Sequence, residues 1–124
     1  VDRYMPNDFY LELIRLYTQN RTEVVNVTIF SESDSFEPFA AFSNYNLALD
    51  TDPLLVWDAL LASDIAIISK SSFSLVPAWL RNHGRVVSGP QYHTLLPGWE
   101  FINHWDEGRR KREINRLATQ CPPQ

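Results

Sequence analysis

Residues 64–80 read DIAIISKSSFSLVPAWL, and this stretch decides the fold class. Residues 65–69 form a short apolar run that ends in a polar turn, and a helical pattern begins directly after Ser71 and Ser72. This order predicts a strand, a short loop and a helix. In open α/β sheets, ligands bind at junctions of this kind, outside the carboxyl end of a strand.

The turn in this stretch carries side chains that suit an anion. A helix that begins near Ser72 leaves its first backbone N–H groups without partners in the helix, and the aligned peptide dipoles make that end partly positive. Serines at a helix start are also ordinary caps, so the residues alone favour capping over phosphate binding. The stretch has neither the GxGxxG nor the GxxxxGK[ST] pattern. The small hydroxyls and one ammonium group that would surround a phosphate or diphosphate belong to Ser69, Lys70, Ser71, Ser72 and Ser74.

Helical and strand patterns alternate along the rest of the chain. Asn7 is expected to cap the first helix, and Pro53 suits the first turn of a later one. The apolar face of that later helix is expected to consist of Leu54, Trp57, Leu60 and Leu61. We expect helices at residues 8–18, 37–42, 54–62, 72–80 and 106–119, strands at 24–30, 46–49, 65–69 and 86–87, and a loop at 89–101.

Strands separated by helices predict an α/β fold with right-handed crossovers. We expect a three-layer, Rossmann-like lobe with a parallel sheet of about four strands, covered by helices on both faces. At 124 residues the chain has the size of one domain, which we place at residues 1–120 with a tail at 121–124. Its 44% hydrophobic and 21% charged residues are typical of globular proteins.

Composition also bears on partners and chemistry. The net charge of −4 argues against a nucleic-acid partner, and the basic run at residues 109–112 is interpreted as a solvated helix face. Cys121 has no second cysteine to pair with, and the three histidines lack metal-binding spacing. Two glycosylation sequons begin at Asn20 and Asn26; such tripeptides occur by chance, and the second falls in an expected buried strand.

Four segments resemble the α-1,2-fucosyltransferases. Residues 67–80, IISKSSFSLVPAWL, are similar to the donor-site segment of that family, whose usual form is close to IIxNSSFSWWxAWL. Residues 4–10 look like its "lPxxYY" helix start, and residues 29–31 resemble its "FSDD" strand end. Residues 86–90, followed by Trp99, are similar to its "vixPxxW" ending. The matches occur in the family's order and span nearly the whole chain.

The resemblance implies the nucleotide-sugar-binding lobe of a GT-B-type glycosyltransferase. Such an enzyme transfers fucose from GDP-fucose to a glycan acceptor with inversion and usually without a metal, and the diphosphate lies over the helix start at Ser71 and Ser72. Asp50 and Asp52 lie where a carboxylate would accept from guanine, although a turn-forming role fits them equally well. The nucleotide-sugar-binding residues expected from the resemblance are Ser31, Glu32, Asp50, Asp52, Ser69, Lys70, Ser71, Ser72, Phe73 and Ser74.

The chain departs from the family pattern at several points. The acidic pair of "FSDD" becomes Glu32 and Ser33, and the asparagine before the serines becomes Lys70, which either pairs with the diphosphate or points to water. The family's HxRxGD-like segment, whose arginine neutralises the leaving diphosphate, would precede Tyr4 and is not in the sequence. We therefore expect a fragment of a longer enzyme, whose acceptor-binding N-terminal lobe is missing, and assign no catalytic residue.

Two other functions stay open. A degenerate lobe would keep the fold and serve only as a structural or interaction module. A GT-B lobe for another nucleotide sugar would share the same sheet and helix start. The expected location is the Golgi lumen for a eukaryotic secretory parent and the cytoplasm for a bacterial one.

Overall fold

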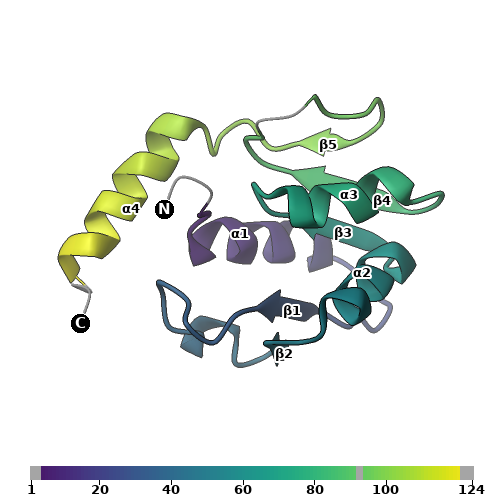
Figure 1. Ribbon diagram of the computed structural model, residues 1–124, viewed down its shortest axis with the longest axis horizontal. Coiled ribbons are helices and arrows are strands. Elements are labelled where there is room, and N and C mark those ends of the chain that lie inside the picture. Colours follow the sequence, from purple (N-terminus) through teal and green to yellow (C-terminus); the bar gives the residue numbers. More distant parts are fainter. Residues whose placement is uncertain (1–3, 92–93, 121–124) are drawn as a thin grey trace.

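The computed structural model describes residues 4–91 and 94–120, and they form a mixed α/β fold with parallel strands (Figure 1). The expected tail at residues 121–124 lies outside the described residues. The elements in chain order are α1 (Asn7–Thr18), β1 (Thr28–Ser31), the 3-10 helix η1 (Ala40–Phe42), β2 (Asn46–Leu49), α2 (Pro53–Ala62), β3 (Ile65–Ile68), α3 (Ser72–Leu80), β4 (Arg85–Ser88), β5 (Glu100–Phe101) and α4 (Glu107–Gln120).

The strands form two parallel sheets. β1 pairs with β2, and β3, β4 and β5 form the second sheet in that order. The expectation of one sheet of about four strands is therefore wrong. Side chains connect the two sheets instead, because Ile29 of β1 and Ile67 of β3 pack on the same cluster around Leu11 and Ile14 of α1.

Alternate side chains of β3 face opposite layers of the fold. Ile65 and Ile67 pack on the cluster that includes Phe9 and Leu13 of α1, whereas Ala66 and Ile68 pack with Leu75 and Ala78 of α3. This two-residue period is what a strand buried on both faces requires. The apolar run at residues 65–68 is therefore explained by helices on both sides of this sheet.

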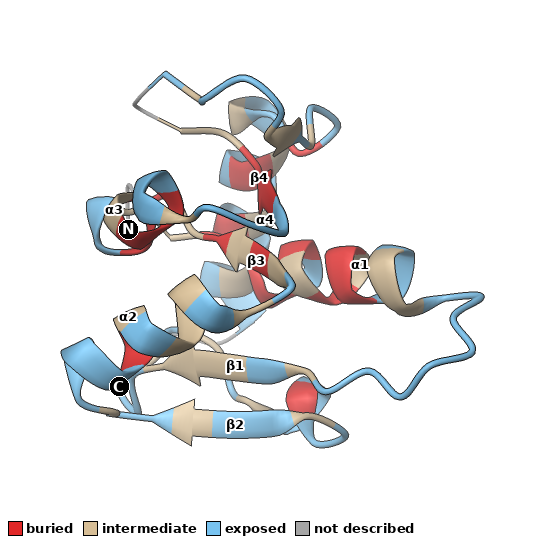
Figure 2. Cartoon of the chain, turned by 90° about the vertical axis from the view of Figure 1, so that its right-hand side faces the viewer, coloured by how far each residue is buried: buried red, intermediate tan, exposed pale blue. Residues whose placement is uncertain are grey.

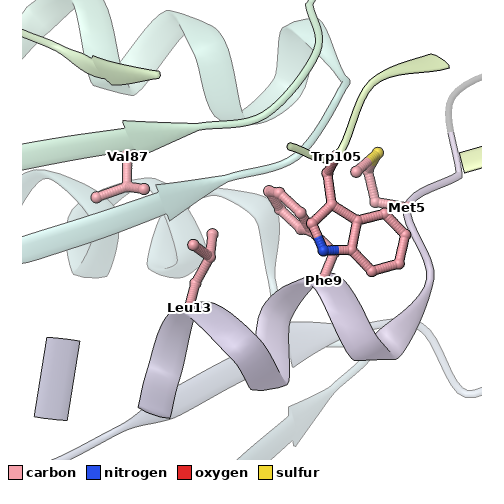
Figure 3. Close-up of a cluster of buried hydrophobic side chains, with 5 residues drawn as sticks. All are labelled: Met5, Phe9, Leu13, Val87 and Trp105. Atoms are coloured by element: carbon pink, nitrogen blue, oxygen red, sulfur yellow. The ribbon is translucent and has the colours of Figure 1, made fainter. Parts of the chain in front are cut away.

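A cluster of buried hydrophobic side chains fixes α1 against the second sheet (Figure 3). Phe9 and Leu13 share one side of α1 and meet Val87 of β4, while Trp105, which follows β5, lies edge-on to Phe9 with ring centroids 6.0 Å apart. A Cβ on Gly89 would lie 2.7 Å from the Phe9 ring. The start of α1 therefore lies at the carboxyl ends of β4 and β5.

Helices α2 and α3 run side by side in the same direction. The Arg81 guanidinium, just after α3, donates to the carbonyl oxygens of Leu60 and Ser63 at the end of α2, the second at 2.8 Å. Closer to their starts, the rings of Trp57 and Phe73 lie 5.9 Å apart. Both helices follow parallel strands, so their N-termini lie at the carboxyl edge of the strands.

Most expected elements are confirmed, and several details are wrong. Residues 24–27 are not a strand, and Val24 is 90% exposed, because no neighbouring strand pairs with this segment. Strand β5 lies inside the expected loop at residues 89–101. Leu54 of α2 is 71% exposed, so the apolar face of this helix is only partly covered, and Val56 is its buried residue.

Polar positions near the chain ends also differ from expectation. Asn7 is the first residue of α1, not its cap, and its side chain donates to the Pro38 carbonyl at 3.0 Å. The basic run is not a solvated face throughout, because Arg110 is 3% exposed. The Arg109 guanidinium lies 3.8 Å from the centroid of the Trp105 ring.

Gly84 should be intolerant of a side chain. It has φ +75°, and a Cβ would lie 2.4 Å from the Asp64 carbonyl oxygen, whereas Gly98 has φ +86° with nothing within 4 Å of a Cβ. We expect Gly84→Ala to lower the free energy of unfolding by about 3 kcal/mol, from backbone strain and overpacking together. Gly98→Ala should cost about 1 kcal/mol, from strain alone. Urea unfolding measures both, and equal losses would contradict the close contact at Gly84.

Candidate functional site

The carboxyl edge of the strands collects the ends of elements that are far apart in sequence. The β3–α3 turn lies there, and so do the segments that follow β1, β2, β4 and β5. The N-termini of α1, α2 and α3 point to the same edge. An edge of this composition presents backbone N–H groups and helix dipoles to a ligand.

The β3–α3 turn is closed by its own serines. Ser74 Oγ accepts the backbone N–H of Ser69 at 3.1 Å and lies 3.0 Å from Ser69 Oγ. Ser71 is the N-cap, and its Oγ accepts the N–H of Phe73 at 3.3 Å. The Gln91 side chain donates to the Ser69 carbonyl from the segment after β4. Ser72 and Phe73 are exposed on the first turn of α3.

The four helix starts differ in the charge of their acceptors. The N–H of Asn7 donates to Glu37 Oε1 at 2.8 Å, that of Leu54 to Asp52 Oδ1 at 2.9 Å, and that of Arg109 to Asp106 Oδ1 at 2.8 Å. These carboxylates offset the partial positive charge of α1, α2 and α4. Among the described residues, helix α3 has the neutral hydroxyl of its Ser71 cap as the acceptor at its start, at the longest of the four distances. Its start therefore retains the most positive potential for an anion.

Lys70 points away from solvent. It is 4% exposed and forms an ion pair with Glu107 Oε1 at the start of α4. Arg110 contacts the same carboxylate, with Nη2 at 3.1 Å from Oε2, and donates from Nη1 to the Tyr4 carbonyl at 2.8 Å. The alternative in which Lys70 points to water is wrong. Direct contact with a diphosphate stays a prediction.

Lys70, Glu107 and Arg110, which we call the buried triad after its two buried cations, carry two positive charges and one negative, and the Glu107 side chain is 42% exposed. Lys70 and Arg110 are nearly fully buried, where charges act more strongly than in water. Partial burial raises the pKa of Glu107, but hydrogen bonds and charge from Lys70 and Arg110 outweigh it and lower this pKa below its ordinary value. Glu107 is therefore held as the anion that its two cations require.

A second group of expected residues lies after β1 and β2. Asp50 has φ 53°, its N–H donates to the Ser31 carbonyl at 3.0 Å, and its Oδ1 accepts the Ser33 N–H at 3.0 Å. Hydrogen bonds from the side chain and backbone of Ser33 lower the pKa of Asp50. Asp52 caps α2 with its side chain, and Glu32 is exposed beside this group.

The structure thus places the ten expected residues in two groups on one edge. Ser31, Glu32, Asp50 and Asp52 lie after the first sheet, and residues 69–74 lie after β3. The contact between Trp57 and Phe73 connects the two groups through α2 and α3. Three polar residues at this edge are missing from the expected set, because their roles depend on tertiary contacts: Glu37, Glu107 and Arg110.

Tyr4 and Glu37 form a further contact beside α1. The Tyr4 hydroxyl donates to Glu37 Oε1 at 2.7 Å. Burial first, and then the neighbouring Glu37, raise the pKa of Tyr4 well above its ordinary range. The Tyr4 hydroxyl is therefore a fixed donor, and the segment that resembles "lPxxYY" is held to the loop after β1.

Neither metal ligands nor a membrane span are found in the described part of the chain. Within residues 4–91 and 94–120, no three His, Cys, Asp or Glu side chains are grouped to hold a metal ion. Across the same residues, no helix combines the length and apolar character needed to cross a bilayer. No family model, curated protein or solved structure matches the chain.

The two cations of the buried triad should make Glu107 more important for stability than Lys70. Glu107→Gln removes the carboxylate that buried Lys70 and Arg110 share, and we expect it to lower the free energy of unfolding by about 2 kcal/mol. Lys70→Met keeps the Glu107 contact with Arg110 and should cost less than about 1 kcal/mol. Urea unfolding of both variants measures this difference. A larger loss of unfolding free energy in Lys70→Met than in Glu107→Gln would contradict the prediction.

The loss of unfolding free energy caused by Glu107→Gln should depend on pH. Because the folded-state pKa of Glu107 is lowered, its stabilising effect is complete above the ordinary value of 4.5 and is lost as the pH falls through the folded-state value. The difference in unfolding free energy between wild type and variant should therefore be constant above about pH 5.5 and shrink below pH 4.5. A difference that grows on acidification would contradict this contact.

Proposed function

We propose that the chain is the donor-binding lobe of a fucosyltransferase-like glycosyltransferase of the GT-B type, which binds GDP-fucose with its diphosphate over the start of α3. One observation carries the proposal. Among the four helix starts described above, only that of α3 lacks a carboxylate acceptor while it lies at the carboxyl edge of the strands. A diphosphate would supply the negative charge that this helix start lacks.

The resemblance supports the same position. The serines of the SSFS motif are Ser71, the cap of α3, and Ser72 and Ser74 in its first turn. The family places the donor diphosphate at this motif, and the match in register is independent of the capping comparison. Together they favour phosphate binding over a capping role alone.

The buried triad adds a favourable field without direct contact. Its buried cation Lys70 lies in the turn itself, between Ser69 and Ser71. A helix start contributes about 0.3–1 kcal/mol to binding an anion in exposed settings and up to about 2 kcal/mol when partly buried. We assign Lys70 to this background charge, and the ligand contacts to Ser71, Ser72 and the backbone of α3.

The first group is assigned to the nucleoside. Asp50 is held by the Ser33 N–H through Oδ1, and its second oxygen, Oδ2, is the acceptor we assign to the two adjacent N–H donors of guanine. Asp52 contributes by capping α2 and so fixes the loop that carries Asp50. The proposal gives the chain donor binding and no catalytic residue; the glycan acceptor would bind to another lobe of the same polypeptide.

The proposal includes a Rossmann-like layering of this lobe. Its support is the second sheet, where β3 and β4 are covered by α1 on one face and by α3 on the other. The first sheet and its helix α2 would extend these layers in the complete enzyme. A metal-independent transfer is the reaction that the resemblance implies.

A degenerate lobe is the second candidate, and one observation favours it. Six of the ten expected ligand residues already use a polar side-chain atom within the chain: Asp50, Asp52, Ser69, Lys70, Ser71 and Ser74. Such a lobe would keep the fold and bind no nucleotide sugar. A GT-B lobe for another donor differs from the main proposal only in the base and sugar that it prefers.

Titration calorimetry with GDP, UDP and ADP tests the proposal. We expect GDP to bind most tightly, and Ser72→Ala to weaken GDP binding by about threefold to tenfold through the loss of one hydrogen bond of about 1 kcal/mol. Ser43→Ala is the matched control, because Ser43 is exposed before β2, at the opposite edge.

Each alternative predicts a different result in this titration. If UDP or ADP binds more tightly than GDP, the donor is a sugar nucleotide of that base and not GDP-fucose. Failure of all three nucleotides to bind would favour the degenerate lobe. If Ser72→Ala and Ser43→Ala lose equal affinity for GDP, the start of α3 is not part of the binding site.

A further inference from the structure

The connection between α1 and β1 is exposed at residues 19–26, and Val27 before β1 is partly buried. Figure 2 shows it as exposed chain that leaves the end of α1 and returns to β1 on the outside of the molecule. It contains both sequons, Asn20-Arg21-Thr22 and Asn26-Val27-Thr28. Neither is used by the proposed donor site.

Asn20 lies where α1 has just ended. It has φ 61°, and the Arg21 side chain donates to the Tyr17 carbonyl at 3.1 Å, so the turn is held to the helix. Asparagine is among the residues that accept this left-handed conformation, which explains its use after a helix. That role does not require the exposed hydroxyl of Thr22 two residues later.

Asn26 has no such backbone reason. It has an ordinary negative φ, lies outside β1 and is exposed, as is Thr28 at the first position of the strand. The expectation that this sequon is buried in a strand is therefore wrong. Both asparagine side chains are accessible in the folded protein.

The connection lies at the edge opposite the candidate site. The end of α1 is near the starts of β4 and β5, because Arg85 lies over the Tyr17 ring at 4.9 Å and the Tyr17 hydroxyl donates to Glu100 at 3.0 Å. Strand β1 also begins at this edge. A large group on Asn20 or Asn26 would therefore leave the β3–α3 turn accessible.

We propose that Asn20 and Asn26 are N-glycosylated, in a compartment that contains an oligosaccharyltransferase. The amide nitrogen of each asparagine attacks C1 of an oligosaccharide carried on a polyprenyl diphosphate. A C1–N bond forms, the bond from C1 to the diphosphate oxygen breaks, the amide loses one proton, and the polyprenyl diphosphate leaves. The glycans would flank Val24, which is 90% exposed and lies between the two sequons.

Mass spectrometry of the protein purified from the cells that make it tests the assignment. Cleavage after glutamate gives peptides 13–23 and 24–32, which contain one sequon each. We expect both peptides to carry hexosamine-containing glycans, and peptide N-glycosidase in heavy-oxygen water to convert each acceptor to labelled aspartate. A peptide found only in its unmodified form overturns the assignment of its asparagine.

Variants translated in the presence of microsomes provide matched controls. Wild type should gain two glycans, and Thr22→Ala and Thr28→Ala should each lose one. Thr28→Ser keeps the hydroxyl and should retain two glycans, whereas Asn20→Gly keeps the left-handed turn and should lose one. Two glycans on Thr22→Ala, or no glycan on wild type beside a glycosylated control protein, would overturn the proposal.

Discussion

The carboxylate of Glu107 is the group on which the arrangement of the site depends. It joins Lys70 in the β3–α3 turn to Arg110 in α4, and Arg110 reaches the Tyr4 carbonyl before α1. Three segments that are far apart in sequence therefore meet at one anion. Because both cations are nearly fully buried, the shared carboxylate stabilises both of them there. The contact fixes α4, which otherwise has only Ile114 as a buried apolar residue.

This constraint also decides what the turn presents to a ligand. Lys70 is drawn into the protein, so the outer surface of the turn consists of the Ser71 cap, the exposed Ser72 and Phe73, and the first N–H groups of α3. A lysine at the surface would have offered one mobile charge. A buried lysine leaves the serine hydroxyls and backbone N–H groups of the turn as fixed donors. Fixed donors suit a ligand recognised by shape as well as by charge.

The sequence predicts a helix or strand well where the residues that determine it lie within that one segment. The apolar run and serine cap around β3 and α3, and Pro53 at the start of α2, give these elements correctly. Strand β5 is only two residues long and exists because β4 is beside it, and the valine-rich segment at residues 24–27 lacks such a neighbour. The burial of Lys70 and Arg110 is a tertiary effect that composition argues against, because charged residues are rarely buried unless paired. The positions of the expected ligand residues were accessible to sequence reasoning, but their internal partners were not.

The division into two sheets makes the two halves of the edge unequal in rigidity. Strands β3 and β4 alternate between buried layers, whereas β1 contains no fully buried residue and β2 is mostly exposed. The free energy of local opening follows buried apolar contacts, so we expect local opening to be easier in the first sheet than in the second. In the proposed complex the serine turn of α3 would be preorganised, while the loop that carries Asp50 would gain order when the ligand bridges the two sheets. Ligand binding would begin at the more rigid edge of the second sheet and be completed at the less rigid edge of the first sheet.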